Sequence, residues 1–302
     1  MKIVVLAGGL STERQVSLTS GTGVCRALRQ RGHQAILVDM FLGLESYTGR
    51  LADVFDAPDG LCGDNQVLST EPDLEAVRRS RKDQGPSLLG KDVLAVCAMA
   101  DIVFLAVKPQ YLEAVLTEIR GAVRPFQVFV SLAPGKTLDW LSQRLGSETK
   151  LIRTMPNTPA MVGAGMTGLC VNSHVTESET SLVCELCNTF GRTEVVPEAL
   201  IDVVVGVSGS SPAYVFLFLE AMADAAVADG MPRAQAYEFA AQAVMGSAKL
   251  MLETGKHPGE LKDMVCSPAG TTIEAVRVLE EKGFRSAVIE AQKACVKKAK
   301  GL

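Results

Sequence analysis

The residues best suited to hold a small anion lie near the C-terminus, in the string "CSPAGTTIEAV" from Cys266 to Val276. The small residues Ala269–Gly270 let a ligand approach the backbone, and amides at a helix start around Thr271 and Thr272 attract a carboxylate. Thr271 and Glu274 also have the spacing of a capping box. An ordinary capped helix start has the same residue types, so the string alone leaves both interpretations open.

A glycine-containing loop near the N-terminus raises a different question. In "KIVVLAGGLSTERQVS" an apolar strand runs into Gly8 and Gly9, where a dinucleotide-binding fold has its phosphate loop. The usual fingerprint needs glycines at its first, third and sixth positions, and Leu10 to Arg14 do not supply them. The later "GTGVCR" at Gly21 follows "SLTS" and no strand, so it favours a plain helix start.

Composition excludes some partners. The 302 residues carry a net charge of -4 and 5% aromatic residues, which argues against a nucleic-acid partner. The apolar run "AYVFLFL" stops at Glu220, short of the ~20 residues that span a bilayer, so we expect a buried helix and no membrane partner. A basic-then-apolar leader is missing after Met1, which favours a cytoplasmic location.

The eight cysteines are interpreted as reduced thiols, because no secretory leader accompanies them. Cys184 and Cys187 have the CxxC spacing of a metal or redox centre. They lie in a helix-like apolar stretch without a second CxxC or a spaced histidine pair. The pair is therefore interpreted as small buried hydrophobic residues, and no metal is expected.

The elements that must position these residues change in kind along the chain. Up to about Leu200, apolar runs such as "IVVLA", "AILVD", "DIVFLAV", "VFVSLA" and "KLIRTM" alternate with helical patterns, which predicts a parallel sheet buried on both faces. Segments 212–229, 233–254 and 271–299 instead have helical periodicity. The segment 43–91 mixes turn residues and charge, and it is interpreted as long loops.

From Ala106 onward the sequence contains several long and distinctive strings. The strings "AVKPQ", "SLAPG", "IRTMPNTPAMVGAGMTGL", "SGSSPAYVFLFLEAMADA" and "HPGELKDMVCSPAGTTIEAVRVLEEKGFRSAVIEA" occur in this order. Residues 101–302 thereby resemble pyrroline-5-carboxylate reductase, the last enzyme of proline synthesis. The resemblance implies reduction of 1-pyrroline-5-carboxylate to L-proline by hydride transfer from NADPH or NADH. It also implies a homodimer or higher homo-oligomer built through the helical half.

The resemblance assigns residues to the site. Reduction of a cyclic imine needs hydride at carbon, a proton or hydrogen bond at nitrogen, and a hold on the carboxylate. The implied substrate-binding residues, with Thr272 also implied as catalytic, are Glu198, Ser267, Gly270, Thr271 and Thr272. The implied cofactor-binding residues are Val107, Lys108, Pro109, Leu132, Ala133 and Asn157.

Residues 1–105 resemble a different family. "VVLAGGLSTERQVSLTSG" and "GPSLLGKDVLAVCAMADIVFLA" are similar to the N-terminal domain of D-alanine:D-alanine ligase. That resemblance implies that Gly8, Gly9, Ser11 and Glu13 form a ligase-type loop, whose glutamate helps to hold a substrate amino group. We therefore expect a chimera whose two parts join within residues 101–106.

The expected fold has two domains. Residues 1–198 form an α/β Rossmann-like parallel-sheet domain, which is ligase-like in 1–105 and reductase-like in 106–198. Residues 199–302 form an all-α dimerisation and substrate domain. Asp39, at the end of the second strand, is a candidate acceptor for a ribose hydroxyl, which would favour NADH. One alternative is a folded but catalytically weak fusion that lacks a competent dinucleotide loop. A ligase fragment is the least favoured alternative, because no ATP-binding domain follows residue 106.

Overall fold

The computed structural model describes residues 1–63, 65, 71–82 and 87–301. The chain divides into two compact units, Met1–Gly209 with Ala299–Leu302, and Ser210–Lys298. The division falls after Gly209, whereas the sequence predicts a boundary after Glu198.

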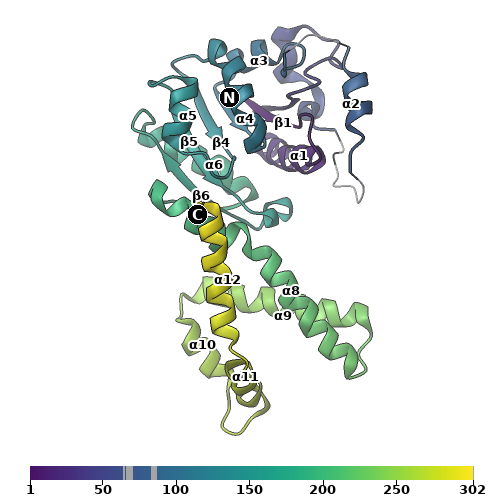
Figure 1. The fold of residues 1–302 in the computed structure, drawn as a ribbon, viewed down its shortest axis with the longest axis vertical. Helices are drawn as coiled ribbons and strands as arrows, with labels where there is room; N and C mark the ends of the chain where they lie inside the picture. The colour runs from purple at the N-terminus through teal and green to yellow at the C-terminus, as the bar shows by residue number, and fades with distance from the viewer. Residues whose placement is uncertain (64, 66–70, 83–86, 302) are drawn as a thin grey trace. The chain divides into compact units, whose positions relative to one another are not determined.

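The first unit is built on one sheet of seven strands (Figure 1). The strands are β1 (Lys2–Ala7), β2 (Gln34–Asp39), β3 (Ile102–Leu105), β4 (Val128–Ser131), β5 (Lys150–Met155), β6 (Gly165–Val171) and β7 (Gly191–Val195). Its helices are α1 (Arg14–Gln30), α2 (Leu74–Ser80), α3 (Val93–Met99), α4 (Pro109–Ile119), α5 (Leu138–Leu145), α6 (Glu177–Cys187) and α7 (Ile201–Val204).

The strand order is β2-β1-β3-β4-β5-β6-β7, with only the β5–β6 pairing antiparallel. β1 therefore has β2 on one side and β3 on the other, so the chain crosses over β1 between these two strands. In open α/β sheets, ligands bind at the carboxyl ends of the strands beside such a crossover. The carboxyl ends of β1 and β3 are the place to look for a site.

The sheet is buried on both faces, as its continuous apolar strands predict. Along β1, Val4 and Leu6 pack into one apolar cluster while Ile3 and Val5 pack into the other. Helix α1 covers the second face through residues that include Leu28, and α3, α4 and α5 supply the first. The glycine at position 21 lies inside α1 and does not start it, which corrects the predicted helix start.

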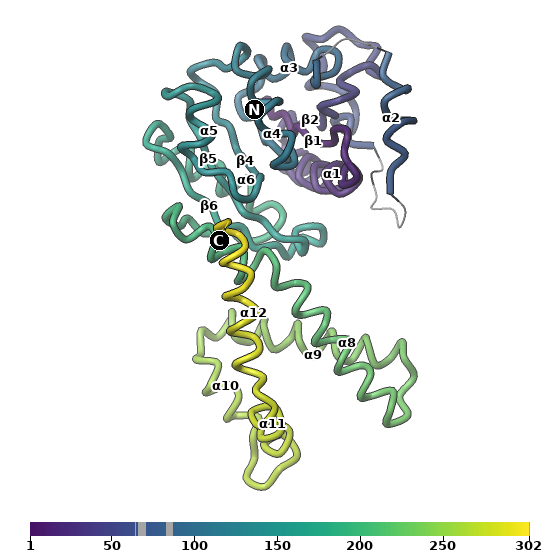
Figure 2. The backbone as a smooth tube through the Cα atoms, in the orientation of Figure 1, coloured from purple at the N-terminus to yellow at the C-terminus, as the bar shows by residue number. Residues whose placement is uncertain are grey.

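Segment 43–91 between β2 and β3 contains short helices as well as loops. Residues 51–56 and 58–61 are 3-10 turns. Helix α2 follows them along the chain and is labelled in Figure 2. Part of the predicted long loop, 64, 66–70 and 83–86, lies outside the described residues. Arg81 is 4% exposed and donates to the carbonyls of Ser87 and Leu89.

The second unit is all helical, as predicted. It contains α8 (Ser211–Ala228), α9 (Arg233–Thr254), α10 (Pro258–Val265), α11 (Thr271–Glu281) and α12 (Phe284–Ala299). The segment 271–299, which has helical periodicity, forms two helices, and Gly283 between them has φ of 75°.

Many large apolar side chains of these helices are exposed, among them Phe216, Leu217 and Phe239. The helical run Glu198–Ala228 has 31 residues, and its 18-residue apolar window has a mean hydropathy of 1.6 and is 17% buried. By length and composition alone this run would suffice to cross a membrane. The expected buried helix at "AYVFLFL" is wrong, because its large apolar side chains are mostly exposed. Exposed apolar helices of this kind also mark protein–protein interfaces.

Candidate active site

Three strands that neighbour one another deliver the expected cofactor residues to one edge of the sheet. Val107, Lys108 and Pro109 follow β3, Leu132 and Ala133 follow β4, and Asn157 follows β5. These strands are mutually parallel, so their carboxyl ends lie at the same edge. The structure thus brings together the residues expected along the nicotinamide half of a dinucleotide.

Each of these residues is fixed by its surroundings. Val107 and Ala133 are 3% and 2% exposed. Pro109 is the first residue of α4, where a backbone N–H has no partner within the helix, so proline costs no hydrogen bond there. Asn157 donates from Nδ2 to the Ser208 carbonyl at 3.0 Å and accepts at Oδ1 from the Met166 amide at 2.8 Å. Its side chain therefore ties the end of β5 to neighbouring backbone.

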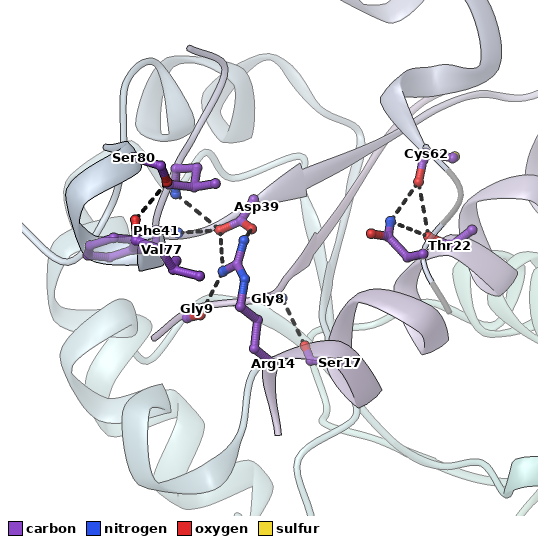
Figure 3. A network of polar contacts seen from close by, with 12 residues as sticks. Gly8, Gly9, Arg14, Ser17, Thr22, Asp39, Phe41, Cys62, Val77 and Ser80 are labelled. Atoms are coloured by element: carbon purple, nitrogen blue, oxygen red, sulfur yellow. Dashed lines mark hydrogen bonds and ion pairs between the residues drawn. The ribbon is translucent and has the colours of Figure 1, made fainter. Parts of the chain in front are cut away.

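The loop after β1 is tied to the loop after β3 through Ser17. The Gly8 amide donates to Ser17 Oγ at 2.9 Å (Figure 3). Ser17 Oγ in turn donates to the Ala106 carbonyl at 2.8 Å. Gly8 and Gly9 have φ of 78° and 96°, which glycine adopts without strain. The Gly8 amide, of the kind a phosphate loop offers to its ligand, is thus already bonded within the chain.

The same loop has no space between its glycines and the end of β2. A Cβ on Gly8 would meet Asp39 Oδ2 at 2.8 Å, and one on Gly9 would meet Met40 Cε at 2.6 Å. The room that these glycines leave is filled by side chains of the protein itself. In a dinucleotide fingerprint such room admits the pyrophosphate.

A buried ion pair joins the start of α1 to the end of β2. Arg14 donates to both carboxylate oxygens of Asp39 and, at 2.7 Å, to the Gly9 carbonyl (Figure 3). Asp39 also accepts from the amides of Phe41 and Leu42 at 2.9 and 3.1 Å. Because these four hydrogen bonds engage the carboxylate, the structure does not support Asp39 as an acceptor for ribose, and the preference for NADH that depended on it loses its basis.

Lys108 is held by a partner that sequence reasoning missed. Its ammonium lies 3.0 Å from Glu13 Oε1, and the two side chains are 25% and 51% exposed. Glu13 is the N-cap residue of α1 and makes no capping hydrogen bond with its side chain. This pair spans the crossover between β1 and β3, so these loops do not fit a pyrophosphate as they stand.

Glu198, expected to contact substrate, is part of a polar cluster in the first unit. Its Oε1 accepts from the Leu138 amide at 2.7 Å and from Arg153 Nη1 at 3.3 Å. Arg153 is 2% exposed and also donates to Asp202 Oδ1 at 3.2 Å. This cluster fixes Glu198 in place.

The other expected substrate residues lie in the second unit, at the turn before α11. The Gly270 amide donates to the Ser267 carbonyl at 3.0 Å, and Ala269 has φ of 57°. Gly270 is the N-cap of α11, and Thr271 and Thr272 are its first residues. The predicted capping box is wrong, because Thr271 lies inside the helix and Glu274 pairs with Arg277.

Comparisons with known proteins cover both units. The family model "Pyrroline-5-carboxylate reductase dimerisation" matches residues 198–302, and "NADP oxidoreductase coenzyme F420-dependent" matches residues 51–135. Pyrroline-5-carboxylate reductase of Escherichia coli K12 is 62% identical over 207 residues, which are 68% of this chain and 77% of that protein. Pyrroline-5-carboxylate reductase 2 of Bos taurus is 38% identical over 263 residues, 85% of this chain and 81% of that protein.

Solved structures agree over the whole chain. A pyrroline-5-carboxylate reductase from Coxiella burnetii has a TM-score of 0.75 at 28% identity and covers 99% of this chain and 97% of its own. The one from Streptococcus pyogenes has a TM-score of 0.74 at 27% identity and covers 100% and 99%.

The fold and the strand-end residues define a two-domain oxidoreductase with a Rossmann-like domain followed by a helical dimerisation domain, which confirms the predicted fold class. The chain belongs to the pyrroline-5-carboxylate reductase family. The match to residues 51–135 crosses the junction predicted within 101–106. The comparisons therefore give no support to a ligase-type segment that extends to residue 105, or to a ligase fragment as the function.

Proposed function

We infer that this protein reduces 1-pyrroline-5-carboxylate to L-proline with NADPH or NADH as the hydride donor, as the last step of proline biosynthesis. The observation that carries this conclusion is 62% identity over 207 residues to the Escherichia coli reductase. Those residues amount to 68% of this chain and 77% of that protein.

The turn before α11 is proposed to hold the substrate. Ser267, Gly270, Thr271 and Thr272 surround the amino end of a helix of 11 residues, where backbone amides attract a carboxylate. Thr272 is proposed as the catalytic residue, with its hydroxyl at the ring nitrogen. Glu198 is proposed as a further substrate contact, and its bond from the Leu138 amide fixes its carboxylate.

The cofactor-side proposal is supported by the common edge of the sheet. Val107, Lys108, Pro109, Leu132, Ala133 and Asn157 are proposed to contact the nicotinamide half of NADPH or NADH. A bound dinucleotide would supply the hydride. The protein residues supply a closely packed wall through Val107 and Ala133, and one positive charge through Lys108.

The decisive experiment measures oxidation of NADPH and NADH by absorbance, with and without pyrroline-5-carboxylate. Substrate-dependent oxidation is expected, and its absence from folded protein would refute the function. Thr272→Val removes the proposed catalytic hydroxyl at nearly constant volume and is expected to lower kcat. The matched control Thr180→Val, in α6, is expected to leave kcat unchanged.

Assembly, location and origin follow as further proposals. We propose a homodimer or higher homo-oligomer through the helical unit, with a domain boundary near residue 198, a cytoplasmic location, and neither nucleic-acid nor membrane partners. The exposed Phe216, Leu217 and Phe239 support the assembly, and sedimentation of the purified protein tests it.

A ligase-type origin of residues 1–105 is supported by the string "GGLSTERQVS" alone. Sequencing source DNA across codons for residues 101–106 tests whether the two parts are joined in one reading frame.

A further inference from the structure

We propose that Glu13 is an internal competitor for the dinucleotide phosphates: its carboxylate occupies the Lys108 ammonium at the β1–β3 crossover and thereby sets the affinity of this protein for its cofactor. The proposal rests on the proposed function, because it concerns the same edge of the sheet.

The position of the pair is the first step. Glu13 ends the loop after β1, and Lys108 lies in the loop after β3, the two loops that flank the crossover. The oxygen-to-nitrogen distance is 3.0 Å. A carboxylate at that position has the charge of a phosphate oxygen, and α1 directs its positive N-terminal end to the same place.

The surrounding backbone is the second step. The Gly8 amide is bonded to Ser17, and the room beside Gly8 and Gly9 is filled from β2. Within the described part of the chain, the Ser11 hydroxyl of the same loop is buried and has no hydrogen-bond partner. The Ser11 hydroxyl therefore remains to meet an incoming phosphate, but the positive charge of Lys108, in the loop after β3, is already paired with Glu13.

The exposure of the pair is the third step. Glu13 is half exposed, so its carboxylate can leave Lys108 without being buried elsewhere, and an exposed ion pair is weak. The dinucleotide can therefore displace Glu13, but it must break the pair and bring phosphate near a like charge. Removing the charge removes both penalties.

The test is equilibrium binding of NADPH, followed by the fluorescence of the reduced nicotinamide and by calorimetry, without substrate. Glu13→Gln is expected to bind NADPH about tenfold more tightly at low salt, the size of one like-charge interaction a few ångströms away in a surface environment. The gain is expected to shrink at high salt, because exposed charges are screened. Glu148→Gln is the matched control, because Glu148 precedes β5 and so lies at the opposite edge of the sheet. The Glu148→Gln variant is expected to bind NADPH as tightly as the unaltered protein.

Lys108→Gln completes a double-mutant cycle. If Glu13 acts through Lys108, the gain from Glu13→Gln is expected to be smaller when Lys108 is already Gln. Equal or weaker binding by Glu13→Gln overturns the proposal, and so does a gain that Glu148→Gln reproduces. The proposed function fails separately, if the unaltered protein shows no substrate-dependent oxidation at saturating NADPH while Glu13→Gln still changes binding.

Discussion

The buried Arg14–Asp39 pair is expected to be one of the most sensitive points of the first unit. The side chains of Arg14 and Asp39 are 6% and 14% exposed. Among the described residues, Arg14→Ala would leave the Asp39 carboxylate with the amides of Phe41 and Leu42 as its partners. Removal of one partner of a buried ion pair costs about 3–5 kcal/mol, and the remaining amide bonds favour the lower end, about 3 kcal/mol.

Asp39→Ala is expected to cost more than Arg14→Ala, because it also removes the acceptor of both amides. The double variant Arg14→Ala with Asp39→Ala leaves no unpaired charge, so it is expected to be more stable than the sum of the two single losses predicts. Urea unfolding followed by the fluorescence of Trp140 measures this, since Trp140 is the only tryptophan and lies in α5 of the same unit. A loss below about 1 kcal/mol for Arg14→Ala, or additive single losses, would refute the reasoning.

Three further outcomes are expected. Gly43→Ala should destabilise the protein by about 1–3 kcal/mol in urea unfolding, because Gly43 has φ of 64° and a Cβ there would collide with a facing backbone carbonyl. Cys97 and Cys187 should react with an aromatic disulfide reagent only after unfolding, since burial raises the pKa of both thiols to about 12; rapid reaction of the native protein would contradict this. Burial raises the pKa of Glu179, but hydrogen bonds, among them one from Lys150, outweigh it and hold the pKa below the usual 4.5. The stability from Glu179 is therefore present above about pH 4.5 and lost as pH falls below it, and Glu179→Gln should flatten that decline in acid unfolding.

The central strands are predictable from the sequence because their residues are apolar on both faces. β1 and β3 are continuous apolar runs, and both appear where the sequence places them. β6 and β7 were not singled out, because β6 contains two glycines and β7 is largely exposed. Their position depends on pairing with β5 and with each other, and the local sequence of a strand does not predict its pairing partners.

The candidate site also contains some residues whose position the sequence predicts and others whose position it does not. The family resemblance implies Ala133 and Asn157 as cofactor residues, and their position at one edge follows from the parallel strands that precede them. The Glu13–Lys108 pair joins residues far apart in the sequence, and neither has a local pattern that names its partner. The start of α11 shows the opposite error, since the capping-box spacing is present but Gly270 serves as N-cap.

The architecture separates two tasks that a cofactor site performs together. Contacts proposed for the nicotinamide come from the loops after β3, β4 and β5, whereas the loop after β1 is where a phosphate would meet the protein. In this chain the Gly8 amide of the loop after β1 is bonded to Ser17, and Glu13 of the same loop pairs with Lys108 of the loop after β3. A loss confined to phosphate contacts weakens ground-state and transition-state binding alike. The protein should therefore need a high concentration of NADPH while retaining a kcat set by the intact strand ends and helical unit.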